Sequence, residues 1–326
     1  MSLAERITRD FKPAWWLPGP HLQTLWPPLF RRFKNKLPLR RERIELADGD
    51  FVDLDWSQRE HGPIVLLLHG LEGSVNSPYA RGLLHECNAQ GWRAVVMHFR
   101  GCSGELNRLP RAYHSGDTAD LAEVVNLLRE REPNTVLAAI GVSLGGNVLL
   151  KWLGETGSNN PLITAAAISV PFDLSKSVDF LQQGFSRVYD KHLLTCVKEK
   201  FARKLATTEL AVSLSQLQSF KNLREFDDKI TAPLHGFIDA ADYYIKSSCR
   251  PYLSSINVPT LIVNALDDPF VPIEVIPTVQ EISSQVTLAL TERGGHVGFI
   301  GGASPWRPEY WLENEVAAFL KLKLQE

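Results

Sequence analysis

Short runs of apolar residues alternate with longer stretches of helical periodicity along most of the chain beyond residue 60. The apolar runs cover residues 64–68, 93–99, 135–142 and 163–170, and the helical stretches cover about 79–90, 118–131 and 145–154. Each run is apolar at almost every position, which indicates a strand that is buried on both faces. Strands of this kind that alternate with helices predict an α/β protein whose mostly parallel, twisted sheet is covered by helices on both faces.

The regions on either side of this alternation extend the same core. Residues 43–46 and 51–56 alternate between apolar and polar side chains around the turn 47–50, which predicts a hairpin ahead of the first parallel strand. Near the carboxyl terminus we expect strands at 260–265 and 286–290, and helices near 273–283 and about 308–323.

Residues 172–256 interrupt the alternation of strands and helices. Within them Leu194, Val197, Phe201 and Leu205 recur at spacings of three, four and four residues, which is typical of an amphipathic helix. We therefore expect a helical cap insertion at 172–256. The core then consists of 43–171 and 257–326, and residues 1–42 form an amino-terminal arm.

The arm is unusual in being both aromatic and basic. It contains Trp15, Trp16 and Trp26, it is interrupted by several prolines, and its end is rich in cations: Arg31, Arg32, Lys34, Lys36, Arg40 and Arg41, followed by Arg43. One interpretation is peripheral docking to anionic lipid. The other, which we favour, is an arm that packs its aromatic side chains onto the core while its charges stay solvated.

Composition narrows the classes of partner. The 35 basic residues nearly balance the 37 acidic ones, so no field favours nucleic acid, and no nucleic-acid-binding motif is found. The four cysteines (Cys87, Cys102, Cys196 and Cys249) are widely spaced, which suggests neither a zinc site nor a disulfide framework. No apolar run approaches the ~18 residues of a membrane span. We expect a cytoplasmic protein that needs no metal and no cofactor.

The sharpest chemical signal is the segment Gly141-Val142-Ser143-Leu144-Gly145-Gly146, placed where a buried strand ends and a helix begins. This is the G-x-S-x-G pattern of a nucleophile elbow, in which small residues let a strained turn expose the serine hydroxyl. The alternative is a phosphate-binding loop. That loop needs Lys-Ser or Lys-Thr where this chain has Asn147-Val148, so the pattern favours Ser143 as a nucleophile.

A serine hydroxyl needs a base, and the base needs a carboxylate to orient it. In this architecture the acid follows a late strand and the histidine follows the last strand. Asp267 and Asp268 both come directly after the strand at 260–265. We prefer Asp268, because Pro269 forces it into extended geometry. The other aspartate could serve as the N-cap of the helix expected at 273–283.

Nine histidines compete for the role of base, and position along the chain distinguishes them. His296 is the one that follows the last expected strand, and glycines flank its loop. His69 begins the loop His69-Gly70-Leu71-Glu72-Gly73-Ser74 after the strand at 64–68, a form that presents a backbone N–H to a developing oxyanion. We assign the backbone N–H groups of Leu71 and Leu144 as the two oxyanion donors.

Four segments carry a resemblance to a known family: HGLEGS at 69–74, GVSLGGN at 141–147, NALDDPFVP at 264–272 and GGHVGF at 294–299. With GPHLQTLW at 19–26 and FRGCSG at 99–104, they resemble the YheT-like branch of the α/β-hydrolase superfamily. That branch includes animal and yeast lipases with an abhydrolase domain and enzymes that act on medium-chain acyl ethyl esters. The resemblance implies the α/β-hydrolase fold and a Ser-Asp-His hydrolase, with the three residues at Ser143, Asp268 and His296.

The function that follows is a serine hydrolase that cleaves carboxylic esters of short to medium acyl chains through an acyl-enzyme. Its partner would be a small, acyl- or lipid-like ester. Two alternatives remain open at this stage. An acyltransferase would pass the acyl group to an alcohol instead of water, and a catalytically silent binding module could use the same fold.

Overall fold

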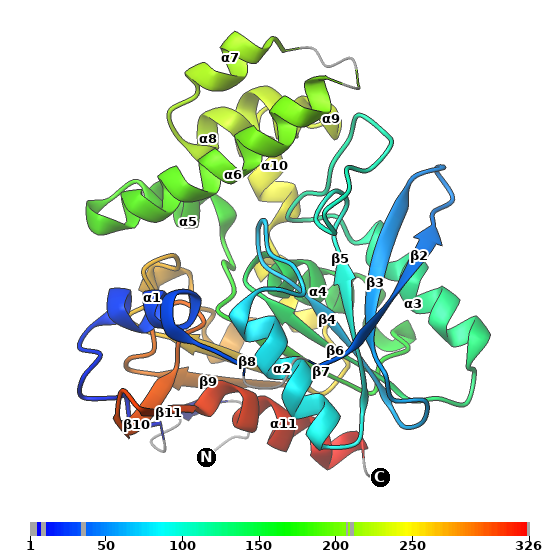
Figure 1. Ribbon diagram of the computed structural model, residues 1–326, viewed down its shortest axis with the longest axis vertical. Coiled ribbons are helices and arrows are strands. Elements are labelled where there is room, and N and C mark those ends of the chain that lie inside the picture. Colours follow the sequence, from blue (N-terminus) through cyan, green and yellow to red (C-terminus); the bar gives the residue numbers. More distant parts are fainter. Residues whose placement is uncertain (1–4, 8–10, 34–36, 207, 209–211, 325–326) are drawn as a thin grey trace.

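The computed structural model describes residues 5–7, 11–33, 37–206, 208 and 212–324. Within these residues nine strands form one sheet in the order β1-β9-β8-β7-β6-β4-β5-β3-β2 (Figure 1). The strands are β1 (Glu5–Ile7), β2 (Leu39–Glu45), β3 (Phe51–Ser57), β4 (Ile64–Leu68), β5 (Arg93–His98), β6 (Leu137–Val142), β7 (Thr164–Ile168), β8 (Thr260–Ala265) and β9 (Val286–Thr291). The β2–β3 and β3–β5 pairs are antiparallel, and the other pairs are parallel. The prediction of a mostly parallel sheet with a hairpin ahead of β4 is therefore confirmed, whereas the short parallel strand β1 was not expected.

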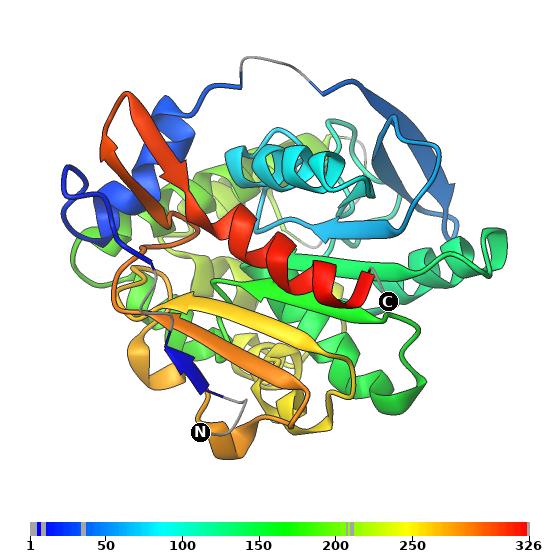
Figure 2. The same ribbon diagram turned by 90° about the horizontal axis from the view of Figure 1, so that it is seen from below.

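Helices cover both faces of the sheet, as the uniformly apolar strands predict. On one face lie α2 (Pro78–Ala89) and α11 (Trp311–Leu324), and Figure 2 shows α11 lying diagonally across the strands. On the other lie α3 (Ala119–Arg131) and α4 (Leu144–Thr156). In β4, Leu66 and Leu68 pack toward α3 and α4, while Val65 and Leu67 pack toward α2 and α11. Successive side chains of a strand point to opposite faces, so both faces of β4 are buried.

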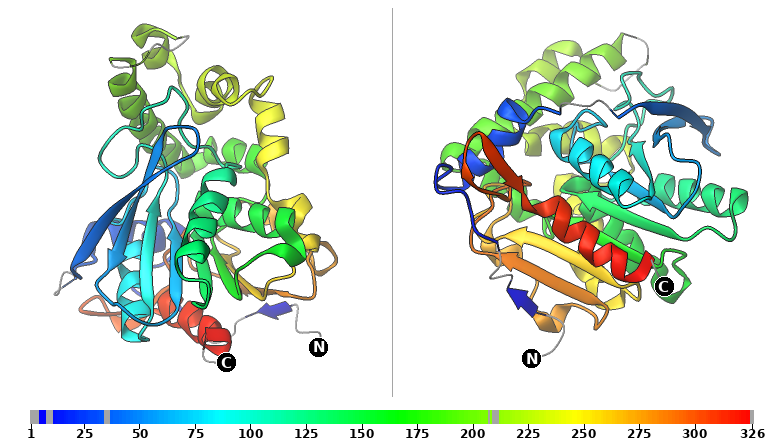
Figure 3. Two further views of the ribbon diagram at one scale, coloured as in Figure 1. Left: turned by 90° about the vertical axis from the view of Figure 1, so that its right-hand side faces the viewer. Right: turned by 60° about the horizontal axis from the view of Figure 1, so that its bottom comes forward.

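The segment of the chain between β7 and β8, where the sequence predicts the insertion, forms a group of helices above the sheet (Figures 1 and 3). They are α5 (Leu174–Leu181), α6 (Arg187–Leu205), α7 (Leu214–Ser219), α8 (Leu223–Phe226), a π-helical turn (Asp227–Thr231), α9 (Ala232–Leu234) and α10 (Ala240–Ser247). Leu194, Val197 and Phe201 are buried on α6, so the amphipathic helix is confirmed. We refer to α5–α10 as the cap. None of the helices in the described ranges is long and apolar enough to cross a membrane.

The amino-terminal arm packs on the core through its aromatic side chains. Its helix α1 (Pro20–Phe30) places Trp26 against Trp16, with 4.6 Å between ring centroids, and Phe11 packs on Phe299 and Trp311. Several of the basic residues are held by acids: Arg31 pairs with Glu313, Arg41 with Asp55 and Arg43 with Asp53. These contacts support the packed arm, but the expectation that its charges stay solvated is wrong for Arg31, which is largely buried with its acid. Lys34 and Lys36 of the basic run lie outside the described residues.

Two expectations about the carboxyl-terminal part are wrong in detail. The helix expected near 273–283 is replaced by two 3₁₀ turns, Ile273–Val275 and Val279–Glu281. Pro277 lies between them. A proline has no backbone N–H to donate to the preceding turn of a helix, and its ring clashes with the carbonyl group of that turn, so a continuous helix cannot form here. The last helix begins at Trp311, not at 308, because β10 (Ile300–Ser304) and β11 (Arg307–Tyr310) form an antiparallel hairpin before it. Further 3₁₀ turns occupy Gly157–Asn159, Gly184–Ser186 and Arg250–Ser255.

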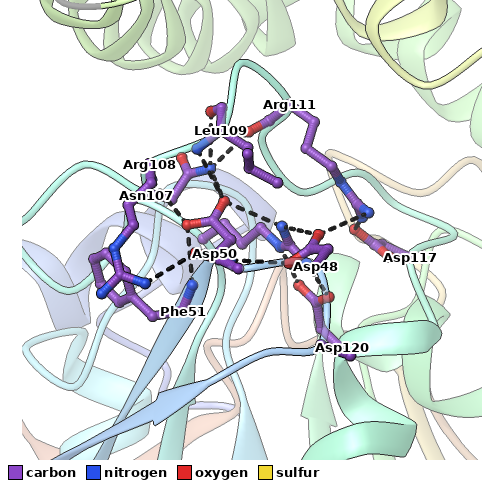
Figure 4. A network of polar contacts seen from close by, with 12 residues as sticks. Asp48, Asp50, Phe51, Asn107, Arg108, Leu109, Arg111, Asp117 and Asp120 are labelled. Atoms are coloured by element: carbon purple, nitrogen blue, oxygen red, sulfur yellow. Dashed lines mark hydrogen bonds and ion pairs between the residues drawn. The ribbon is translucent and has the colours of Figure 1, made fainter.

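A buried polar network anchors the β2–β3 turn to the loop after β5 (Figure 4). Arg100, 2% exposed, donates to both carboxylate oxygens of Asp120 at 2.7 Å and to Asp50 at 3.1 Å. Burial alone would raise the pKa of Asp50, but hydrogen bonds from the Asn107 side chain and neighbouring amides lower it below its ordinary value. Asp50 therefore stays ionised, and the loop from 100 to 117 is held beside the sheet.

We predict that Arg100→Met lowers the free energy of unfolding by about 3–5 kcal/mol, because it leaves buried carboxylates without their cation. Arg108→Met is the matched control. Arg108 belongs to the same network, but its side chain is 46% exposed and pairs with an exposed Glu45, so the expected loss is under about 1 kcal/mol. Urea denaturation of the two variants and the wild type measures both values. Equal losses would show that burial of the network is not what makes it stabilising.

Candidate active site

The turn between β6 and α4 holds Ser143 in a strained conformation. Its backbone angles are φ 53° and ψ −117°, a region that residues with a side chain avoid. A Cβ on Gly141 would lie 2.5 Å from the Gly145 carbonyl oxygen, and one on Gly145 would lie 2.5 Å from that of Leu68. The glycines around the serine are therefore required by close approach of the backbone, as the G-x-S-x-G pattern predicts.

The structure brings Ser143, His296 and Asp268 into one hydrogen-bonded series. Ser143 Oγ lies 3.0 Å from His296 Nε2, and His296 Nδ1 lies 2.8 Å from Asp268 Oδ2 and 3.1 Å from Oδ1. These residues follow the parallel strands β6, β9 and β8, so their side chains meet at the carboxyl edge of the sheet. With Nδ1–H donating to the carboxylate, Nε2 is left with a lone pair directed at the serine hydroxyl.

Three contacts orient His296. The Phe270 ring stacks on the imidazole with 4.0 Å between centroids. The His296 N–H donates to Thr24 Oγ1 at 2.9 Å, and the neighbouring Val297 N–H donates to Ser169 Oγ at 3.1 Å. Thr24 belongs to α1, so the arm supports the histidine loop. This role of Thr24 cannot be predicted from the sequence, because no local pattern signals a contact between residues 272 positions apart.

The two neighbouring aspartates have different surroundings. Asp268 contacts His296, whereas Asp267 Oδ1 accepts the Gly295 N–H at 2.9 Å. Burial raises the pKa of Asp267, although hydrogen bonds from the Gly295 and Gly294 amides oppose that effect. The suggestion that the second aspartate caps a helix is wrong, because no α-helix follows it. Asp267 instead fixes the loop that carries His296.

The loop after β4 approaches the elbow closely and leaves one amide unengaged. A Cβ on Gly70 would lie 3.3 Å from Ser143 Cβ. The Gly70 N–H donates to Tyr79 OH at 2.8 Å, and the Glu72 N–H donates to Tyr113 OH at 2.9 Å. Between these two amides, the Leu71 N–H donates to no protein acceptor in the described part of the chain. The same holds for the Leu144 N–H, at the first residue of α4.

His69 is part of the scaffold of that loop. Its side chain is fully buried, with Nδ1 2.7 Å from the Gly70 carbonyl oxygen and Nε2 3.2 Å from the Phe99 amide nitrogen. Burial lowers the pKa of His69 to about 3, so the ring is neutral near pH 7. The sequence interpretation of His69 as the start of the loop agrees with these contacts. The loop also depends on Tyr79 and Tyr113, which no local sequence pattern indicates.

A cavity of about 690 Å³ opens over Ser143, His296 and Leu71 and extends beneath the cap. Its walls are mainly apolar and come from α1, α5, α6 and α8, with side chains that include Leu25, Leu174, Leu181, Leu193, Val197, Phe201 and Phe226. The aromatic side chains of Tyr189 and Phe201 in the cap also line the cavity. Among the described residues, no group of three His, Cys, Asp or Glu side chains is placed to hold a metal ion.

Comparison with known proteins places the chain in a family. The sequence profile described as "alpha/beta hydrolase fold" matches residues 63–303. The chain is 47% identical over 322 residues to the Escherichia coli (strain K12) protein named "Putative esterase YheT". The alignment covers 97% of this chain and 94% of that protein. It is 32% identical over 315 residues to the human protein named "Phospholipase ABHD3", with 93% of this chain and 77% of that protein covered.

A solved structure shows the same fold. The Pyrococcus furiosus esterase Pf2001 superposes with a TM-score of 0.60 at 18% identity, covering 90% of this chain and 96% of that chain. At that identity the likeness shows the fold alone, whereas the sequence profile and the sequence relatives show which family the chain belongs to. The chain belongs to the α/β-hydrolase family, in its YheT-like branch.

Proposed function

We propose that this protein is a serine hydrolase that cleaves carboxylic esters through an acyl-enzyme. The observation that carries the proposal is the series Ser143–His296–Asp268, hydrogen-bonded at 3.0 and 2.8 Å and open to an apolar cavity. A hydroxyl, an imidazole and a carboxylate in this order are the parts that nucleophilic acyl transfer needs. The likeness to a relative named as an esterase supports the same reaction class.

In the first step His296 Nε2 accepts the proton of Ser143 Oγ as that oxygen attacks the ester carbonyl. Asp268 accepts a hydrogen bond from Nδ1–H and stabilises the imidazolium that forms. When the tetrahedral intermediate collapses, the imidazolium gives its proton to the leaving alcohol. Water then attacks the acyl-serine with His296 again as the base, which releases the carboxylic acid and restores the serine hydroxyl.

The negative charge on the carbonyl oxygen would be stabilised by the Leu71 and Leu144 amides. Tyr79 and Tyr113 engage the amides on both sides of Leu71, so its N–H is held in a loop that does not need to rearrange during the reaction. Donors fixed in advance stabilise a transition state more than mobile ones do. The loss of one such donor typically costs about 3–4 kcal/mol of transition-state stabilisation.

The cavity indicates the class of ester. A volume of about 690 Å³ is in the range of sites for small molecules, and its largely aliphatic and aromatic walls suit an acyl chain. The likeness to the human relative named as a phospholipase supports an ester with an acyl chain. We therefore infer an ester with a short to medium acyl chain.

Ser143→Ala is expected to reduce hydrolysis of p-nitrophenyl butyrate by several orders of magnitude, because the nucleophile is lost while the cavity remains. A fluorophosphonate probe should label the wild type and leave the variant unlabelled, as intact-mass measurement would show. Circular dichroism provides the control for folding. Full turnover by the variant would exclude Ser143 as the nucleophile, and a wild type that is neither active nor labelled would favour a silent binding module.

The neighbouring aspartates offer a matched pair of substitutions. Asp268→Asn should lower kcat by roughly 10³–10⁴-fold, because the amide no longer fixes the tautomer of His296 or stabilises its charge. Asp267→Asn should keep kcat within about tenfold of the wild type, because Asp267 contacts the Gly295 amide and not the imidazole. Steady-state kinetics on one ester measures both. The reverse order of losses would assign the role to Asp267.

The apolar cavity predicts a preference among acyl chains. On p-nitrophenyl acetate, butyrate and octanoate, kcat/KM should rise with chain length as each added methylene leaves water, by at most about 0.8 kcal/mol or roughly fourfold per methylene. Initial rates at substrate concentrations below the micellar range give the comparison. A clear preference for the acetate would show that the cavity does not hold the acyl chain.

A further inference from the structure

One ion pair connects the cap to the loop that carries Leu71. Lys200 lies on α6, and its Nζ is 2.7 Å from Glu72 Oε1. Both side chains are largely buried, at 9% and 12% exposed, and both contribute to the cavity wall. Lys200 Nζ also lies 3.0 Å from Cys102 Sγ and 4.9 Å from the centroid of the Tyr113 ring. The ammonium group is therefore held in one place by an anion, a sulfur and an aromatic face.

Glu72 has an unusual backbone for a residue with a side chain. Its φ is 53°, in the left-handed region, directly after Leu71. Such a conformation costs on the order of 1–3 kcal/mol and persists where its surroundings over-determine it. Here the Glu72 N–H donates to Tyr113 OH at 2.9 Å, and Tyr113 OH lies 2.8 Å from Glu72 Oε1, the oxygen that Lys200 also contacts. Backbone and side chain of Glu72 are thus fixed by the same cluster.

We propose that Lys200 and Glu72 are positioning residues: their ion pair transmits the position of the cap to the loop and keeps the Leu71 N–H directed at the site of the developing oxyanion. This inference rests on the proposed function, and it adds a dependence of the oxyanion donor on a helix of the cap. Without the ammonium group, the Glu72 carboxylate is buried beside a cavity without a cation and turns toward water. Its backbone then relaxes from φ 53°, and the adjoining Leu71 moves with it.

A purely structural ion pair would also join cap and core, so the test must separate the two roles. A structural role predicts lower thermal stability, or a higher KM through a disturbed cavity, with kcat unchanged in the folded protein. A positioning role predicts a loss in kcat at nearly constant KM, because the oxyanion exists only in the transition state and not in the bound ester.

The experiment compares Lys200→Met with Lys198→Met in the full chain, with p-nitrophenyl butyrate as the substrate. Lys198 lies on the same helix, but its Nζ binds the carbonyl oxygens of Gln218 and Phe220 inside the cap. We expect kcat to fall by about 10–100-fold in Lys200→Met, with KM within about threefold of the wild type. In Lys198→Met kcat should stay within about twofold. Equal kcat in the two variants, both folded, would overturn the proposal.

Glu72→Met removes the other member of the ion pair, the one on the loop. It tests the positioning role even if Lys200→Met does not fold. Its kcat should fall at least as far as that of Lys200→Met, and the double variant should be no worse than Glu72→Met, because the two residues act as one unit. Undiminished kcat in Glu72→Met, or losses that multiply in the double variant, would overturn the proposal. A wild type inert toward esters and toward a fluorophosphonate would instead overturn the proposed function, and this inference with it.

Discussion

The backbone at Ser143 is held in a conformation that L-amino acids avoid, and the rest of the site is arranged around that constraint. The turn can be this tight because Gly141, Gly145 and Gly146 carry no Cβ where neighbouring atoms approach. The strand before the turn is buried at every residue, and it lies in the interior of the sheet between β4 and β7. The buried contacts of these elements offset the backbone strain, so the Ser143 hydroxyl is held in a fixed position at the end of β6.

Around the elbow, each part of the site is supported by side chains from other elements. The histidine loop is supported by Thr24 of the arm, and the loop after β4 is supported by Tyr79 and Tyr113. The cap reaches the same loop through Lys200. The arm, the core loops and the cap therefore form one framework about the site. Polar groups are placed before a substrate arrives, which is the condition under which fixed dipoles stabilise developing charge.

The cap combines two physical roles. Its apolar side chains both pack against one another and line the cavity, so the insertion is held together by the same kind of surface that suits an acyl chain. Its polar contacts with the core include those of Lys200 with Glu72 and of Ser186 with the Pro269 carbonyl oxygen. A cap of this kind can define the shape of a binding site while the sheet edge beneath it holds the chemical groups.

The sequence by itself determined the class of the fold and the candidate nucleophile, because both depend on local patterns. Uniformly apolar runs identified β4 and β8 to the residue, and the glycines about Ser143 identified the elbow. Chain order pointed to Asp268 and His296, which the structure then brings into contact. The prediction of a helix near 273–283 was wrong, because Pro277 interrupts the segment and two 3₁₀ turns form on either side of it.

Only the tertiary structure decided which residues orient the site. Thr24, Tyr113 and Lys200 carry no motif, and each acts through a partner far away in the chain. What each of the two neighbouring aspartates contacts is of the same kind. The sequence favours Asp268 through the proline that follows it, but only folding gives Asp268 an imidazole as its neighbour and Asp267 a backbone amide.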